Sequence, residues 1–329
     1  MTPPGRAAPS ATVWAPAKLN LGLEVIRRRA DGYHDIATVV RTVGIFDVVT
    51  VVATDETGVG LAVRGLAIPV TEGAGPGQNL AVLAAEALLT VRSLAHGLRI
   101  TLEKGIPAAA GLGGASSDAA AVLRAVNALM PDPVGEEELH ELALGIGSDV
   151  PLFLTGGASL VGGRGDVVEP ISTTDEATYL VVLPVVGRPL ARKTPALYGA
   201  LWPEDFSGGE RVRVLVGRLR AGKRPDPDGY ANAFRRPLLG IWPELGEVEA
   251  VLRQDATAVA FSGAGPSLYG VYPDQRAAGV ARERLMATVE TPPWTAIAGP
   301  VPLPEVVIPA GQDRAARWVR KPQALSVRS

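Results

Sequence analysis

The chain has 329 residues, of which 47% are hydrophobic, and this length suggests two domains of ordinary size, each with a real core. Its 32 basic and 34 acidic side chains nearly cancel, so no nucleic-acid partner and no acidic tail are expected. The absence of cysteine excludes disulfides, thiolate catalysis and cysteine-ligated zinc, and His34, His96 and His140 are too scattered to suggest a metal site. No signal peptide or membrane-spanning run is visible, so we expect a cytoplasmic protein without a membrane partner.

Apolar runs separated by glycine, proline and polar clusters define the elements expected in the first half of the chain. Residues 1–10 are expected to be flexible. Residues 11–25, with an interruption at 15–18, are predicted to form a strand or hairpin. Further predicted strands cover residues 39–54, with a break near 46–47, and residues 98–104. The predicted helices cover residues 80–94, with Asn79 as N-cap, residues 117–130 and residues 136–144. A strand or turn is expected after Asp149, and a hairpin over 159–166.

A second unit opens with an apolar strand at 179–184. The helices expected in it cover residues 194–201, 210–219, 232–239, 245–253 and 276–288. Residues 259–272 are expected to form strand, glycine turn and strand, and residues 294–298 a last strand. The resulting domains are residues 11–172 and 178–311, with residues 312–329 flexible. Because strands and helices alternate without a strict βαβ repeat, the pattern predicts an α+β or mixed α/β fold.

The glycine-rich run at residues 107–118 is the strongest chemical signal in the chain. Its three glycines lie between a predicted strand and a predicted helix, so several backbone N–H groups and the positive end of the helix can meet one ligand. This arrangement suits phosphate. No Gly-Lys-Ser/Thr follows, and Ser116 stands where a dinucleotide fingerprint has its third glycine, so neither common nucleotide motif is present. The alternative is a simple turn in which Ser116 or Ser117 caps the helix.

Two charged residues in apolar surroundings are further candidates. Lys18 lies in the apolar run 15–22, where an ammonium group either extends to solvent or faces a site, and Asn20 shares its side of the strand. Asp149 must be paired, cap a helix or turn, or act in function. The second glycine cluster, residues 262–267, is either a tight turn or a second wall that lets backbone approach a ligand.

Taken together, these motifs resemble those of the GHMP kinases. The three superfamily motifs occur in order at residues 16–21, 107–120 and 262–265. Further stretches resemble the members that act on a cytidine-bearing substrate: residues 30–34, 79–80, 147–153 and 194–198. The resemblance covers residues 11–300. It implies a ribosomal-protein-S5-like first domain and a ferredoxin-like second domain, with the active site in the cleft between them.

The resemblance implies an ATP-dependent small-molecule kinase of isoprenoid precursor synthesis. Its substrate would carry a cytidine diphosphate group, and Mg²⁺ would accompany ATP. Asp149 would act as general base on the attacking hydroxyl. Lys18 would lie within reach of Asp149, keep it ionised and stabilise charge on the transferred phosphoryl group. The resemblance implies neither the protein ligands of Mg²⁺, for which Ser117 and Asp118 are candidates, nor the oligomeric state.

The remaining site residues are also transferred by resemblance. The implied ATP-binding positions are Asn79, Lys104, Pro107, Ala108, Ala109, Ala110, Gly111, Leu112, Gly113, Gly114, Ala115, Ser116 and Ser117. The implied substrate-binding positions are Asn20, Tyr33, His34, Thr194, Pro195, Tyr198, Gly263 and Gly265. Among these, Tyr33 and Tyr198 would stack on either side of the pyrimidine, and His34 would read the edge of the base.

Two alternatives stay open. One is another GHMP kinase that acts on mevalonate, homoserine or a sugar, for which Tyr33 and His34 would be dispensable. The other is a non-catalytic nucleotide-binding regulator on the same fold, for which Asp149→Asn would leave function unchanged.

Overall fold

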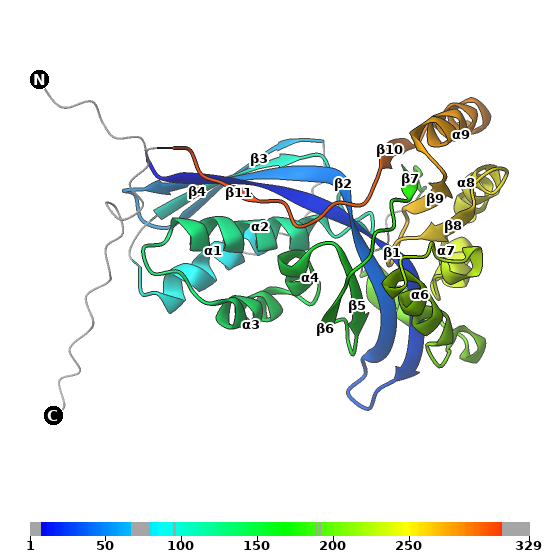
Figure 1. Cartoon of the computed structure of the whole chain (residues 1–329), viewed down its shortest axis with the longest axis horizontal. Coiled ribbons are helices and arrows are strands. Elements are labelled where there is room, and N and C mark those ends of the chain that lie inside the picture. Colours follow the sequence, from blue (N-terminus) through cyan, green and yellow to red (C-terminus); the bar gives the residue numbers. More distant parts are fainter. Residues whose placement is uncertain (1–7, 67–78, 95–96, 188–189, 191, 311–329) are drawn as a thin grey trace, which may run out of the picture.

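Two β-sheets, each covered by helices, organise the chain in the computed structural model (Figure 1). The structure describes residues 8–66, 79–94, 97–187, 190 and 192–310. The predicted flexible ends therefore lie largely outside the described residues, as does His96, although Ser10 already begins the first strand. Within the described part of the chain, no helix is long and apolar enough to cross a membrane.

The first sheet is built around one long antiparallel pair. β1 and β2 remain paired from Ser10 opposite Val52 to Arg28 opposite His34. The described strands of this sheet are β1 (Ser10–Arg28), β2 (His34–Thr54), β3 (Val59–Gly65), β4 (Gly97–Lys104), β5 (Ala158–Gly162), β6 (Val167–Ile171) and β11 (Val306–Val307). Their order is β11-β1-β2-β4-β3, with β5 on the far part of β2 and β6 beside β5. The sheet is antiparallel except for the β3–β4 pair.

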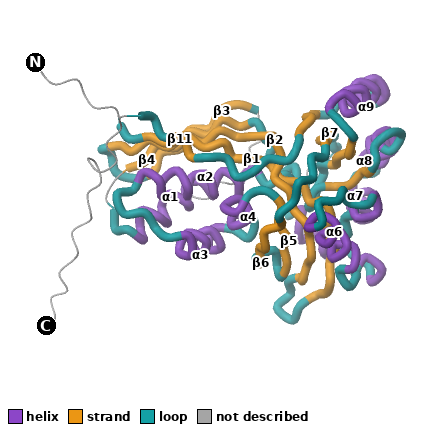
Figure 2. Tube along the Cα trace, viewed as in Figure 1, coloured by secondary structure: helices purple, strands orange, loops and turns teal. Residues whose placement is uncertain are grey.

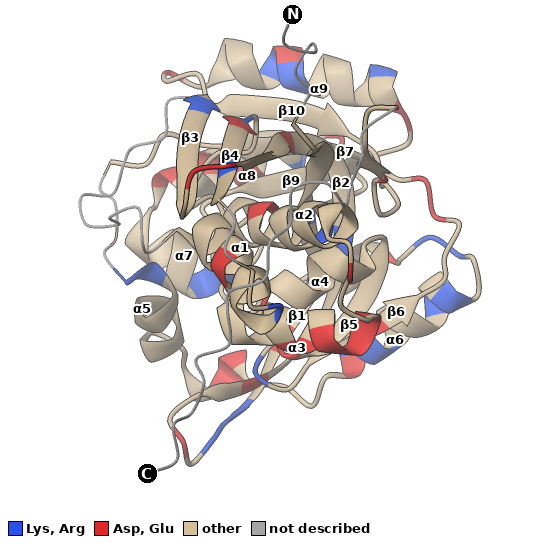
Figure 3. Cartoon of the chain, turned by 90° about the vertical axis from the view of Figure 1, so that its left-hand side faces the viewer, with Lys and Arg blue, Asp and Glu red and all other residues tan. Residues whose placement is uncertain are grey.

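Helices cover one face of this first sheet (Figure 2). They are α1 (Leu80–Val91), α2 (Gly114–Leu129), α3 (Glu136–Ile146) and α4 (Val150–Thr155). The alanine-rich α2 lies in the centre of the core, because its small side chains let it approach both the sheet and α1 closely. The outer helix α3 carries acidic residues in its first turn, where they favour the helix dipole (Figure 3).

The second sheet is smaller and antiparallel, with the order β10-β7-β9-β8. Its strands are β7 (Thr178–Leu183), β8 (Ala258–Phe261), β9 (Leu268–Tyr272) and β10 (Trp294–Ala298). The helices of this second unit are α5 (Lys193–Gly199), α6 (Glu210–Arg220), α7 (Arg235–Ile241), α8 (Glu244–Leu252) and α9 (Gln275–Thr288). Of these, α6 packs against β1 and β2 of the first sheet. The interior of the second unit contains the fully buried rings of Tyr179 and Tyr269, which meet edge to face.

The far half of β1 joins the two units. Leu23 and Val25 form isolated bridges to Asn232 and Phe206 of the second unit. Gly22 is required here, because a Cβ at this position would lie 2.9 Å from a carbonyl oxygen of the segment before α7. The division into residues 11–172 and 178–311 stays a prediction, and β11, from the second of these ranges, pairs with β1 of the first sheet.

Most predicted elements form, but several differ from the prediction. β1 is not interrupted at residues 15–18, and β2 is not broken near 46–47. Instead, the pairing of the two strands shifts register after Pro16, which accommodates the irregular stretch in both strands. The helix predicted from residue 117 already begins at Gly114. The short apolar run after Asp149 forms helix α4 instead of a strand or turn. β3 and β11 were not predicted.

Candidate active site

A cavity of about 360 Å³ lies where the glycine-rich loop, the middle of β1 and the second glycine cluster meet. Nine of the predicted site residues line it: Lys18, Asn20, Ala109, Gly111, Gly113, Asp149, Thr194, Tyr198 and Gly263. These residues come from both units of the chain. The cavity therefore brings together the three motifs that the sequence keeps more than 80 residues apart.

Lys18 is buried in this cavity, and no carboxylate of the described residues forms an ion pair with it. Its Nζ donates a hydrogen bond to Oδ1 of Asn20, and Nδ2 of Asn20 donates to Oγ1 of Thr38 at 2.9 Å. Thr38 thereby fixes which side of the Asn20 amide faces the ammonium group. Burial lowers the pKa of Lys18, and the negative charge of Asp149 offsets this effect only in part. An ammonium group of this kind is favourably placed to meet an anionic ligand.

Asp149 lies at the N-cap position of α4, but its side chain makes no capping hydrogen bond. The carboxylate lines the cavity and acts on Lys18 through its charge, and no ion pair links the two within the described residues. The apolar residues after it are buried in α4 and hold its backbone in place. Asp149 is thus a partly exposed carboxylate on a rigid support, free to accept a proton from a ligand.

The two glycine clusters lie directly against each other. Gly111 has a φ of +83°, and a Cβ there would lie 2.2 Å from the carbonyl oxygen of Ser262. Oγ of Ser262 donates to the Gly111 carbonyl at 3.0 Å, and Asn232 donates to the carbonyl of Gly263 at 2.9 Å. A Cβ on Gly263 would lie 3.0 Å from Nζ of Lys18. Glycine is therefore needed on both sides for backbone to close around the cavity.

Other predicted ATP-binding residues are occupied with structural contacts. Oγ of Ser117 donates to the carbonyl of Pro16 at 2.7 Å, and Asn79 caps α1 through a 2.9 Å bond from the N–H of Ala81. Lys104 forms a buried ion-pair cluster with Asp47 and Asp118. The predicted roles of Asn79, Lys104 and Ser117 toward ATP stay predictions.

The two candidate ligands of Mg²⁺ do not form a site for that ion. Ser117 is committed to a main-chain carbonyl, and one carboxylate oxygen of Asp118 is paired with Lys104. Its other oxygen is buried without a partner, but Asp118 does not line the cavity. No cluster of three or more potential metal-binding side chains occurs in the described ranges. We therefore assign no step to a magnesium ion held by these residues.

Among the predicted cytosine-binding residues, Tyr198 lines the cavity and His34 packs against its ring. His34 stacks directly on Tyr198, with ring centroids 4.4 Å apart and planes 11° apart. Burial and, to a lesser extent, the charge of Arg28 lower the pKa of His34, which favours the uncharged ring. Burial and Asp149 raise the pKa of Tyr198 to about 12. The pair thus presents neutral ring nitrogens and a protonated hydroxyl beside the cavity.

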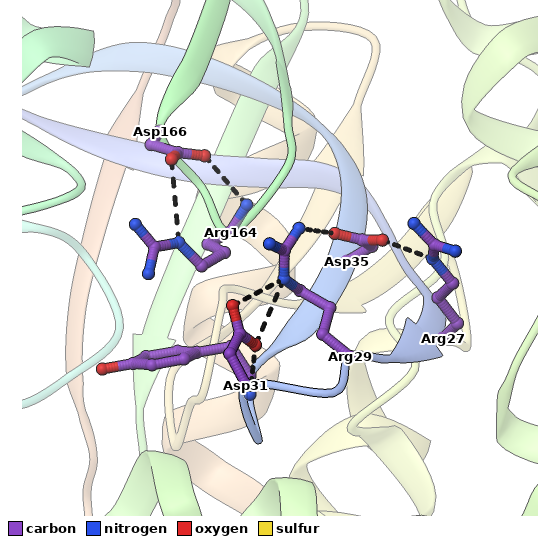
Figure 4. A network of polar contacts seen from close by, with 7 residues as sticks. Arg27, Arg29, Asp31, Asp35, Arg164 and Asp166 are labelled. Atoms are coloured by element: carbon purple, nitrogen blue, oxygen red, sulfur yellow. Dashed lines mark hydrogen bonds and ion pairs between the residues drawn. The ribbon is translucent and has the colours of Figure 1, made fainter.

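Tyr33 lies in the turn between β1 and β2 and is 59% exposed. Its ring faces the guanidinium of Arg164 at 5.1 Å. Ion pairs on the same turn link Arg29 with Asp31 and Asp35, as Figure 4 shows. The predicted sandwich of a base between Tyr33 and Tyr198 stays a prediction.

Sequence reasoning missed several residues that line the cavity, among them Lys193, Thr38 and Phe234. Lys193 opens α5 and reaches back across the cleft to the glycine-rich loop. Phe234 meets the Tyr198 ring edge to face, with centroids 4.9 Å apart. The local sequence around each of these residues resembles an ordinary surface or core position, so no signal marked them.

A cavity with a partly exposed carboxylate, a buried ammonium and two close backbone turns can bind an anion and remove a proton from a neighbouring hydroxyl. This combination is what phosphoryl transfer needs, because the protein contributes positioning and charge stabilisation and little covalent chemistry.

Comparison with known proteins also points to phosphoryl transfer. Residues 79–157 match the model of the GHMP kinase N-terminal domain. A 4-diphosphocytidyl-2-C-methyl-D-erythritol kinase from Desulfotalea psychrophila is 37% identical over 272 residues, covering 80% of this chain and 86% of the relative. A kinase of the same name from Geobacter sulfurreducens is 33% identical, covering 84% of this chain and 95% of the relative.

Solved structures agree with this result. A crystal structure of 4-(cytidine 5'-diphospho)-2C-methyl-D-erythritol kinase, 36% identical, superposes with a TM-score of 0.70 over 88% of this chain and 99% of that one. Homoserine kinase from Cytophaga hutchinsonii superposes with a TM-score of 0.72 over 91% of this chain and 97% of its own, at 18% identity, which shows the shared fold. The expected two-domain GHMP kinase fold is thus confirmed.

Proposed function

Because this chain belongs to the 4-diphosphocytidyl-2-C-methyl-D-erythritol kinase family of GHMP kinases, we propose that its cavity is the active site for that reaction. The enzyme is an ATP-dependent kinase, and the acceptor is the 2-hydroxyl of 4-(cytidine 5'-diphospho)-2-C-methyl-D-erythritol. The observation that carries this proposal is that Lys18 and Asp149 line one cavity together with both glycine clusters.

The proposed reaction assigns one role to each charged group. Asp149 accepts the proton of the 2-hydroxyl as its oxygen bonds to the γ-phosphorus of ATP. The bond between that phosphorus and the bridging oxygen breaks, and ADP leaves with the electron pair. Lys18 stabilises the charge that spreads over the phosphoryl oxygens, and its position is fixed by Asn20. The backbone of the glycine-rich loop holds the phosphates of ATP.

The aromatic end of the cavity supports recognition of the cytidine part. Tyr198 lines the cavity and stacks on His34, so a flat apolar surface and a neutral imidazole lie together. A pyrimidine can stack on such a surface, while ring nitrogens of His34 exchange hydrogen bonds with its edge. We further propose that Mg²⁺ enters with ATP, held by phosphate oxygens and water, as is usual for this ion.

The direct test measures ADP release with Mg-ATP and three acceptors offered separately: the cytidylylated methylerythritol, mevalonate and homoserine. We expect turnover only with the first. Asp149→Asn is the matched control, because the amide keeps the shape of the carboxylate but cannot accept the proton. It should lower kcat by about 10²- to 10⁴-fold while ATP still binds.

Each other outcome would count against part of the proposal. Turnover with mevalonate or homoserine would show that the substrate carries no cytidine, while the cavity would still be the active site of a kinase. Full activity of Asp149→Asn would show that Asp149 is not the general base. ATP binding without turnover of any acceptor would favour a nucleotide-binding regulator.

A further inference from the structure

Lys193 holds together two loops that come from different units of the chain. Its Nζ donates a hydrogen bond to the carbonyl of Ala109, in the glycine-rich loop, at 2.6 Å, and another to the carbonyl of Gly265, in the second glycine cluster. These partners lie 84 and 72 residues away in the sequence. Ala109 is held at a φ of +53°, a conformation rare for alanine, so the loop is fixed tightly at this contact.

An ammonium group has three N–H donors, and the described residues provide acceptors for two of those of Lys193. The side chain lines the same cavity as Lys18 and Asp149. Two ammonium groups therefore face one carboxylate in this cavity, which leaves an excess of positive charge. Burial, followed by the charge of Lys18, lowers the pKa of Lys193 to about 8. An anionic ligand would relieve this repulsion.

We propose that Lys193 is a phosphate-binding residue of the active site, whose free N–H meets a phosphate oxygen while its other two bonds fix the two glycine clusters around that phosphate. This inference rests on the proposed kinase function. The phosphate belongs to ATP, because Lys193 contacts the loop to which the ATP phosphates are assigned, or to the diphosphate of the acceptor. Both candidate phosphates are anionic, so either one would meet the positive charge of Lys193.

The test compares Lys193→Met and Lys193→Arg with wild type, and uses Lys223→Met as a control at an exposed lysine after α6. Methionine keeps the length of the side chain but loses the charge and all three donors. We expect Lys193→Met to lower kcat/KM by about 10- to 100-fold, as for loss of a charged hydrogen bond. Arginine should recover a large part of this loss. The KM values for ATP and for the acceptor, measured separately, identify whose phosphate is bound.

The pH profile separates binding from a purely structural contact. The charged or titratable groups that face Lys193 are Lys18, Asp149 and Tyr198. Since kcat/KM for ATP reports ionisations of the free enzyme, it should fall above about pH 8 in wild type as Lys193 loses its proton. In Lys193→Arg this fall should move to higher pH, because guanidinium stays charged and the other three groups are unchanged.

An alkaline fall that persists unchanged in Lys193→Arg would overturn the proposal. So would a Lys193→Met enzyme that is less stable to urea but keeps both KM values and kcat. Wild type without turnover of the cytidylylated substrate would instead contradict the proposed function, so the two failures are distinguishable.

Discussion

Two lysines are buried close to the glycine-rich loop, and their surroundings are opposite. Lys104, at the end of β4, is paired with both Asp47 and Asp118. Lys18, in β1, donates instead to the neutral amide of Asn20. Burial lowers the pKa of both, but the two carboxylates more than compensate at Lys104 and raise its pKa, whereas Asp149 compensates only in part at Lys18. The first ammonium is neutralised by the protein, and the second is left for a ligand.

The comparison also explains how the loop is positioned. Asp47 accepts hydrogen bonds from the N–H groups of Gly105 and Ile106, at 2.7 and 2.8 Å, immediately before the loop begins. Asp118 lies in α2, immediately after the loop. Lys104 therefore ties the two ends of the loop to β2, while Lys18 faces what the loop surrounds.

The largest expected effect is on stability, from Lys104→Met. This change leaves two buried carboxylates without a cationic partner, so the free energy of unfolding should fall by about 3–5 kcal/mol. Urea unfolding at pH 7 measures it. Lys223→Met, at an exposed position, should fall within about 0.5 kcal/mol of wild type. If Lys104→Met unfolds like that control, the cluster does not stabilise the loop.

Lys18→Met should show the reverse pattern. We expect kcat to fall by about 10²- to 10³-fold, because the charge on the transferred group loses the stabilising ammonium of Lys18. The free energy of unfolding at pH 7 should stay the same or rise. The reason is that a lysine whose pKa is lowered on folding costs stability below its folded pKa and ceases to do so above its ordinary value of 10.5. Comparable stability losses in Lys18→Met and Lys104→Met would contradict the distinction between the two lysines.

Asp118→Asn tests whether Asp118 is protonated in the folded protein. Burial, only partly offset by Lys104, raises the pKa of Asp118 from 3.8 to about 8. The folded state thus binds a proton that the unfolded state releases, and this contribution to stability is complete below about pH 4 and is lost as the pH rises to about 8. Wild type should lose stability between pH 5 and 8 relative to Asp118→Asn, in paired urea titrations. Parallel pH curves for the two proteins would exclude a protonated Asp118.

Thr38→Val should have the smallest effect. It removes the acceptor of the Asn20 amide without changing the shape of the side chain, so Asn20 is less firmly oriented toward Lys18. We expect a loss of up to about tenfold in kcat/KM, in line with one neutral hydrogen bond. Thr12→Val makes the same substitution in the same sheet, at a threonine bonded to Thr50, and should leave kcat/KM unchanged. Equal kcat/KM values for the two variants would show that Thr38 does not help to position Asn20 and Lys18.

The order of elements and the three motifs could be predicted from the sequence, because each depends on local signals. A capping Asn79 before a periodic run and a glycine turn between two apolar strands are examples. Helix α4 was expected as a strand or turn because its apolar run is six residues long, and periodicity cannot separate the two at that length.

Residues whose importance arises from distant contacts could not be predicted. Lys193 precedes a Thr-Pro pair and resembles a surface lysine until the fold brings it to Ala109 and Gly265. Asp47 was expected at a break in a strand, whereas the structure buries it completely as the acceptor of two main-chain N–H groups. Such roles depend on tertiary structure, which a single sequence does not encode locally.

The unbroken β1–β2 pair also has a mechanical consequence. At one end this pair carries the β4 and β11 side of the first sheet, and at the other it is bridged to the second unit through Leu23 and Val25. Register shifts after Pro16, Asn20 and Val25 interrupt the regular hydrogen-bond ladder, but the two strands stay paired along their length. Two paired strands resist bending more than a single connecting chain would. The two halves are therefore not expected to rotate about a hinge when ligands bind. Movement should instead be confined to short segments at the rim, such as the Tyr33 turn, while the catalytic groups keep a fixed spacing.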